Sequence, residues 1–90
     1  MTKKELIAEL AEEMHMTRAH AERVLNKTLA IIQAEVKSGH NVKLSGFGTF
    51  YRGSKAATQA AHPRSGKKID IPQQVMPKFR AGTKFKRLVK

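Results

Sequence analysis

Apolar residues recur every three or four positions over the first third of the chain, which is the spacing of helices with one buried face. The first such stripe consists of Leu6, Ile7, Leu10, Ala11 and Met14. Thr2 and Glu5 before it have the spacing of a capping box, in which the hydroxyl and the carboxylate each satisfy a free amide. The second stripe consists of Ala21, Val24, Leu25, Thr28, Leu29, Ile32 and Val36. With Thr17 as an N-cap and Gly39 as a C-terminal stop, the pattern predicts a helical hairpin over residues 1–39.

Beyond Gly39 the period changes to two, which indicates strands. Residues 42–44 and 49–51 form two such segments, and Gly46 and Gly48 lie between them, as expected for a tight hairpin. Residues 75–79 predict a further short strand whose prolines suit a sheet edge. From Gly82 onward the helical period returns, and a last helix is expected there with Phe85, Leu88 and Val89 inward.

Residues 52–68 contain no apolar side chain larger than alanine except Pro63, and they carry five basic residues and no acid. Pro63 and Gly66 suit a turn. Residues 68–71 then alternate as a returning strand that ends at Pro72. We predict a long, protruding β-ribbon arm over about residues 52–72, with a surface loop lacking strands as the alternative.

Together these elements predict a single α+β domain over residues 1–90. Its parts are a helical dimerisation part (1–39) and a part (40–90) with an antiparallel sheet, the arm and a short C-terminal helix. Without the arm, about 70 residues remain to form a hydrophobic interior, which is marginal for a monomer. A symmetric, intertwined homodimer that pools two half-cores is therefore expected.

The charge of the chain is unevenly distributed. Residues 1–36 have five basic and six acidic side chains, a net charge of −1, whereas residues 37–90 have thirteen basic side chains and Asp70, a net charge of +12. This segregation predicts a near-neutral scaffold with a cationic surface for a polyanion. The longest apolar run is residues 29–32, far short of a membrane span, so a cytoplasmic protein with no membrane partner is expected.

Enzymatic chemistry is poorly supported. The chain has no cysteine, which excludes disulfides and thiolate sites. His15 and His20 are five residues apart, which is not the spacing of a metal pair on a helix, and His40 and His62 fall in expected turns. We therefore predict a non-enzymatic protein with no metal and no cofactor.

Several modes of nucleic-acid binding were compared. A helix-turn-helix is disfavoured because the second helix is the most apolar in the chain, and an RNA-recognition motif because that fold begins with a strand. A basic ribbon can instead lie in a groove of double-stranded DNA, where a rigid, apolar Pro63 would wedge between base steps. The alternative from another class is a basic structural RNA-binding component of a ribonucleoprotein.

A spaced set of glycine, proline and phenylalanine residues carries a family resemblance. It consists of Gly46-Phe47-Gly48-Thr49-Phe50, Pro63-Arg64-Ser65-Gly66, Ile69-x-Ile71-Pro72 and Pro77-x-Phe79-x-x-Gly82 with Lys86. Over all 90 residues the chain resembles the bacterial HU and integration host factor proteins, and HU most. The resemblance implies a histone-like, nucleoid-associated protein whose dimer bends and condenses DNA with two arms in the minor groove. It also implies little sequence specificity and a preference for bent, nicked or gapped DNA, with a heterodimer with a paralogue as the alternative assembly.

The resemblance also assigns roles to individual residues. Pro63 would be the intercalating wedge, and the other DNA-contacting residues would be Lys3, Gly46, Gly48, Arg52, Lys55, His62, Arg64, Ser65, Gly66, Lys67, Lys68, Arg80, Lys84 and Lys86. Two features depart from the family pattern. His62 stands where the family usually has asparagine, and the ascending arm strand has fewer arginines than usual, which shifts binding toward the body.

Overall fold

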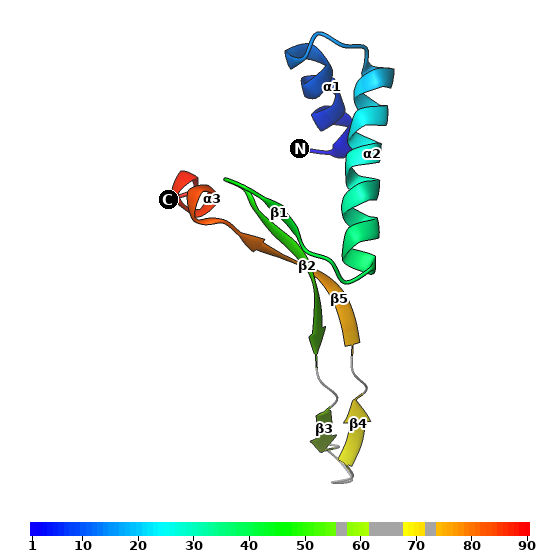
Figure 1. The fold of residues 1–90 in the computed structure, drawn as a ribbon, viewed down its shortest axis with the longest axis vertical. Coiled ribbons are helices and arrows are strands. Elements are labelled where there is room, and N and C mark those ends of the chain that lie inside the picture. Colours follow the sequence, from blue (N-terminus) through cyan, green and yellow to red (C-terminus); the bar gives the residue numbers. More distant parts are fainter. Residues whose placement is uncertain (56–57, 62–67, 72–73) are drawn as a thin grey trace. The chain divides into compact units, whose positions relative to one another are not determined.

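The computed structural model describes residues 1–55, 58–61, 68–71 and 74–90. Figure 1 shows the order of the elements along the chain. They are α1 (Lys3–Glu13), α2 (Arg18–Lys37), β1 (Val42–Leu44), β2 (Gly48–Lys55), β3 (Thr58–Ala61), β4 (Lys68–Ile71), β5 (Gln74–Ala81) and α3 (Thr83–Leu88). This order confirms the predicted α+β fold. The chain divides into two compact units, residues 1–34 and 35–90, and each is described by itself.

Side-chain caps begin both long helices, as the sequence predicts. The Thr2 hydroxyl accepts a hydrogen bond from the Glu5 amide at 3.2 Å, and the Thr17 hydroxyl accepts one from the His20 amide at 3.1 Å. The predicted capping box is only half correct. The Glu5 carboxylate accepts a hydrogen bond from the Thr2 hydroxyl at 3.4 Å and so meets the cap side chain in place of an amide.

Both long helices end with a residue in the left-handed region. At the end of α2, Gly39 has φ +86°, and the amides of Gly39 and His40 donate to the carbonyls of Val36 and Glu35 at 3.0 and 2.9 Å. This is the Schellman motif that the glycine predicts. At the end of α1, His15 takes the same position with φ +53°. A histidine there pays a steric cost that glycine avoids, and nothing in the sequence pattern indicated it.

The three-stranded antiparallel sheet has the order β1-β2-β5. The turn between β1 and β2 closes with a hydrogen bond from the Phe47 amide to the Leu44 carbonyl at 3.0 Å, and Gly46 in this turn has φ +83°. Pro77 lies in β5, an outer strand of this sheet, which confirms the expected edge position. β5 is longer than the predicted segment 75–79, because β2 pairs with it over eight residues.

The β2–β5 pair continues into the β3–β4 pair without a change of register. Lys55 pairs with Gln74, and three residues further along each strand Thr58 pairs with Ile71. The last described pair is Ala61 with Lys68. These backbone pairs confirm that two antiparallel strands run through the segment predicted as an arm, in place of a loop without strands.

All four phenylalanines meet in one cluster in the second unit. Phe47 stacks on Phe85 with ring centroids 5.1 Å apart, and its centroid is 5.2 Å from that of Phe79. Phe50 and Phe79 are direct partners across β2 and β5, with centroids 4.8 Å apart. Aromatic pairs at these separations add to the energy of burial. The cluster therefore fastens α3 to the sheet.

Apolar burial is nevertheless small. Among the described residues, the buried apolar side chains are Ala11, Ala21 and Val36. Large apolar side chains remain exposed in both units, including Ile31 at 52%, Phe47 at 43% and Phe79 at 40%. A single copy of the chain therefore leaves much of its apolar surface uncovered.

Candidate nucleic-acid interface

The two sides of the β1-β2-β5 sheet differ in chemistry. Successive residues of a strand point to opposite sides, and directly paired residues point to the same side. The printed pairs place Val42, Leu44, Phe50 and Phe79 on one side. They place Lys43, Tyr51, Lys78 and Arg80 on the other, and we call this side the cationic face.

Two cations of β5 reach diagonally across β2 on the cationic face. The guanidinium carbon of Arg80 lies 5.2 Å from the centroid of the Tyr51 ring. The side chain of Lys78 lies over Gly53, so that a Cβ at position 53 would be 2.6 Å from Lys78 Cδ. The absence of a side chain at Gly53 therefore makes room for the Lys78 stem.

The β1–β2 turn lies next to the start of α3. The Gly82 amide donates to the Phe47 carbonyl at 2.9 Å, and Lys84 Cδ is 3.6 Å from where a Cβ of Gly46 would stand. The structure therefore brings the predicted site residues Gly46 and Lys84 together.

Gly48 is buried under the edge of β5. A Cβ at this position would lie 2.5 Å from the Arg80 carbonyl oxygen and 2.5 Å from Phe79 Cζ. Gly48 is thus required for packing. It is adjacent to the predicted site residue Arg80, but it is not itself exposed.

Arg52 is placed apart from the cations of the cationic face. It pairs with Pro77 and so belongs to the side of the sheet that carries Phe50 and Phe79. Its Nη1 donates to the Lys37 carbonyl at 3.4 Å. This carbonyl belongs to the last turn of α2, where the helix leaves acceptors unpaired and where a cation is favoured by the helix dipole.

The other predicted residues fall in several places. Lys86 is exposed on α3, and Lys55 and Lys68 are placed by backbone pairing in β2 and β4. Lys3 belongs to the first unit, where it lines a cavity of about 500 Å³ with Lys4, Ile7, Arg18 and Glu22. His62, Pro63, Arg64, Ser65, Gly66 and Lys67 lie outside the described residues.

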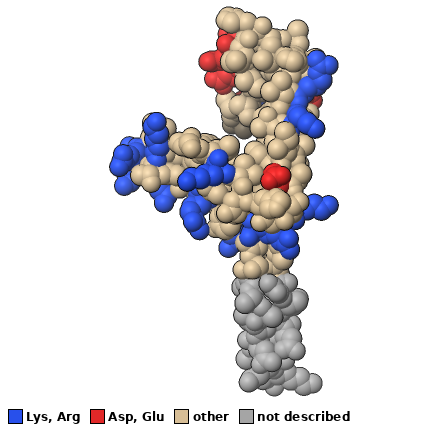
Figure 2. Space-filling model, viewed as in Figure 1, with Lys and Arg blue, Asp and Glu red and all other residues tan. Residues whose placement is uncertain are grey.

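Opposite charges gather on different elements. Figure 2 shows lysine and arginine side chains over the sheet and α3, whereas most of the visible carboxylates lie on α1. Among the described residues of the second unit the acids are Glu35 and Asp70. The segregation predicted from the sequence is therefore retained in the folded chain, and it gives the second unit a surface suited to phosphates.

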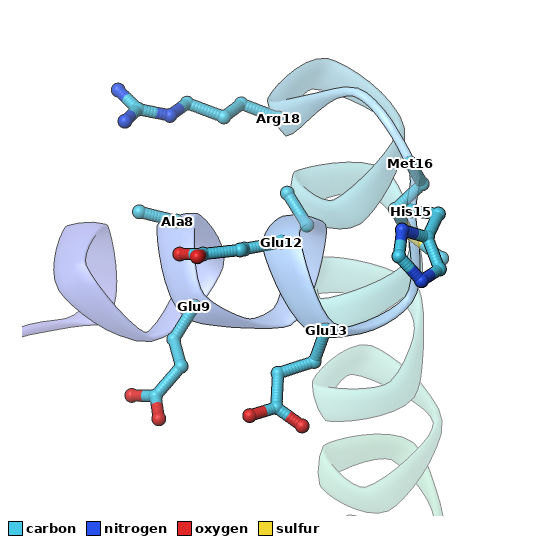
Figure 3. A pocket seen from close by; sticks show the side chains of 8 residues that line it. Ala8, Glu9, Glu12, Glu13, His15, Met16 and Arg18 are labelled. Atoms are coloured by element: carbon cyan, nitrogen blue, oxygen red, sulfur yellow. The ribbon is translucent and has the colours of Figure 1, made fainter.

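The largest cavity of the first unit is acidic. It has a volume of about 800 Å³ and is lined by residues of α1 and of the turn to α2, including Glu9, Glu12, Glu13, His15 and Arg18. Figure 3 shows that Glu9 and Glu13 point away from Arg18, so the lining side chains do not converge on one point. Within the described residues no three His, Asp or Glu side chains are grouped to hold a metal ion.

Membrane insertion was considered separately. None of the helices in the described part of the chain combines the length and the apolar composition needed to cross a bilayer.

Comparison with known proteins defines the class. A family model described as "Bacterial DNA-binding protein" matches residues 1–90. The chain is 40% identical over 86 residues to DNA-binding protein HU-beta of Neisseria meningitidis serogroup A, which covers 96% of this chain and 97% of the relative. It is 37% identical over 86 residues to DNA-binding protein HU of Clostridium pasteurianum, at 96% and 94% coverage.

Solved structures agree with this result. The chain superposes on HU in the structure titled "Anabaena HU-DNA cocrystal structure (AHU2)" with a TM-score of 0.87 and 36% identity, over 99% of this chain and 97% of that chain. HU from Thermotoga maritima matches with a TM-score of 0.72 and 27% identity over 100% of both chains. The chain belongs to the HU and integration host factor family of histone-like bacterial DNA-binding proteins, a non-enzymatic family, and the relatives named here are HU proteins.

Three residues of the cationic face were not singled out from the sequence: Lys43, Tyr51 and Lys78. The alternation of residues 42–44 and 49–51 indicated strands, but which side faces out depends on how β1 and β5 pair with β2. Once Phe50 is taken as buried, its neighbour Tyr51 must lie on the opposite side. That inference was available from the sequence, whereas the contribution of Lys78 required the register with β5.

Proposed function

We propose that this protein is a homodimeric, histone-like nucleoid protein of the cytoplasm that binds and bends double-stranded DNA with little sequence specificity. The observation that carries the proposal is the two-sided sheet, with Lys43, Lys78 and Arg80 on one side and phenylalanines on the other. Cations on one rigid surface match the regular phosphates of a duplex and contribute affinity without reading the base sequence.

The exposed apolar side chains support a dimer. An exposed face that carries Phe47 and Phe79, together with Leu29 and Ile31 of α2, exceeds the scattered apolar residues of an ordinary monomer surface. A second copy of the chain would cover this surface and supply the missing core. A dimer would also present two cationic faces and two ribbons to one DNA molecule.

The ribbons would carry the bending function. The continuous register from β2–β5 into β3–β4 supports a two-stranded arm that extends toward residues 62–67. In the proposed mechanism the arm lies in the minor groove, Pro63 wedges between base steps, and the other predicted tip residues His62, Arg64, Ser65, Gly66 and Lys67 surround it. Bent, nicked or gapped DNA would bind best, because less energy is needed to deform it.

The remaining predicted contacts belong to the body and the base of the arm. They are the amide of Gly46 and the side chains of Lys3, Lys55, Lys68, Arg80, Lys84 and Lys86. The placements of Gly48 and Arg52 favour packing and helix capping, respectively.

Competition binding tests the proposal. A nicked duplex, a linear duplex and a folded RNA of equal length compete for the protein against a fluorescent nicked duplex at fixed salt. We expect the nicked duplex to compete best and the logarithm of affinity to fall linearly with the logarithm of salt concentration. Equal competition by all three would instead favour the ribonucleoprotein alternative.

Bending is tested by energy transfer between dyes at the two ends of the duplex. We expect Pro63→Ala to reduce the bend more than it reduces affinity. An unchanged bend in the saturated complex would refute the wedge role of Pro63.

A further inference from the structure

Tyr51 is the only tyrosine in the chain, and it lies in the middle of the central strand β2. It is half-buried and pairs directly with Lys78, while Arg80 is its diagonal neighbour on β5. The Arg80 guanidinium carbon is 5.2 Å from the ring centroid. The aromatic ring therefore lies among the cations of the face proposed to meet DNA.

This distance is within the range in which a cation is attracted to the face of an aromatic ring. An arginine over a ring has its planar group oriented, and its N–H groups at the edge stay free to donate to phosphate oxygens. Arg80 itself is exposed, so without the ring its long side chain would sample many rotamers. Restricting these rotamers before binding removes an ordering cost from the complex.

We propose that Tyr51 is a positioning residue for phosphate recognition, whose ring holds the Arg80 guanidinium in the orientation that meets the DNA backbone. The inference rests on the proposed function, because it takes the cationic face as the surface that contacts DNA. The ring adds no charge of its own, so its contribution passes through Arg80.

A double-mutant cycle on DNA affinity isolates this coupling. The four proteins are the wild type, Tyr51→Ile, Arg80→Gln and the double variant, and each is titrated with a fluorescent nicked duplex at fixed salt. Isoleucine removes the ring but retains a strong strand preference. We expect Tyr51→Ile to raise Kd about three- to fivefold in the wild type and less than about 1.5-fold when Arg80 is already glutamine.

A conservative variant and the salt dependence separate positioning from a merely structural effect. Tyr51→Phe keeps the ring and should restore affinity to within about 1.5-fold of the wild type, since the cation is attracted to the ring face and not to the hydroxyl. Arg80→Gln should reduce the magnitude of the log–log salt slope by about 0.9, whereas Tyr51→Ile should leave the slope unchanged because the phosphate contact remains.

The emission of Tyr51 provides a measurement on the unaltered protein. The chain has no tryptophan, so tyrosine fluorescence reports this one position. We expect duplex DNA to change the emission of the wild type and to saturate it at the same protein-to-DNA ratio as the fluorescent-DNA titration. In Arg80→Gln the change should be smaller, because the ring no longer has the cation whose environment the DNA alters.

An equal loss of affinity from Tyr51→Ile in both backgrounds would overturn the inference, and so would a loss in Tyr51→Phe as large as in Tyr51→Ile. If Tyr51→Ile does not fold, an emission unchanged by saturating DNA would overturn it. Failure of the proposed function looks different: the wild type itself would show no salt-dependent preference for duplex DNA.

Discussion

Replacing Gly48 with alanine would place a methyl group where the structure has no room. The new Cβ would lie 2.5 Å from the Arg80 carbonyl oxygen and 2.5 Å from Phe79 Cζ, whereas ordinary contacts begin at 3.4 Å. The oxygen is part of the backbone of β5, and the ring is held by Phe47 and Phe50. Relief of the clash must therefore separate β2 from β5 or disrupt the aromatic cluster.

The cost can be bounded from these contacts. Overpacking a well-packed site costs about 1–3 kcal/mol, and a clash with backbone belongs at the upper end. Alanine in a strand recovers about 0.5–1 kcal/mol relative to glycine. We expect Gly48→Ala to lower the free energy of unfolding by about 2 kcal/mol.

Gly53 in the same strand is the matched control. A Cβ there would meet Lys78 Cδ at 2.6 Å, but this is part of a flexible side chain that can turn away. Gly53→Ala should therefore change the free energy of unfolding by less than about 0.5 kcal/mol, or stabilise the protein slightly.

Urea unfolding followed by circular dichroism compares the two variants with the wild type at one protein concentration, because the stability of an oligomer depends on concentration. The physical reasoning predicts a large loss for Gly48→Ala and almost none for Gly53→Ala. Losses within about 0.5 kcal/mol of each other would refute it.

Three other variants test separate parts of the structure. Thr17→Ala should lower the free energy of unfolding by about 1 kcal/mol in the same urea assay, since it removes the cap of α2; no loss would show that the cap contributes nothing. Arg52→Gln should leave the salt slope of DNA binding unchanged and speed amide exchange at the end of α2, whereas Lys86→Gln should reduce the slope by about 0.9; the same reduction in Arg52→Gln would make Arg52 a phosphate contact. Phe85→Ala should cost about 3 kcal/mol and expose the amides of α3 to exchange because it removes the stack on Phe47; unchanged exchange would mean that other contacts hold α3.

Local signals in the sequence predicted the helices and turns well. Thr2, Thr17 and Gly39 act through hydrogen bonds within a few residues, so their roles can be inferred from neighbours along the chain. His15 is the exception. The helix must end there to allow the turn to α2, and the structure accepts a left-handed histidine where a glycine would ordinarily be expected.

The composition of the interface was predictable only in part. Arg80 and Lys84 were identified through the family resemblance, and the structure places them near the β1–β2 turn. Arg52 shows the limit of that approach, because its side of the sheet depends on strand parity and its partner Lys37 lies fifteen residues away. Tyr51 became a candidate only when the pairing of β2 with β5 placed it beside Arg80.

The central claim is that two copies of this chain form one DNA-binding unit, and native mass spectrometry tests it most directly. One chain has a mass of 10.1 kDa. The account predicts a species of twice that mass for the protein alone, and two chains bound to one nicked duplex after DNA is added. A stable single subunit that binds the duplex as one chain would contradict it.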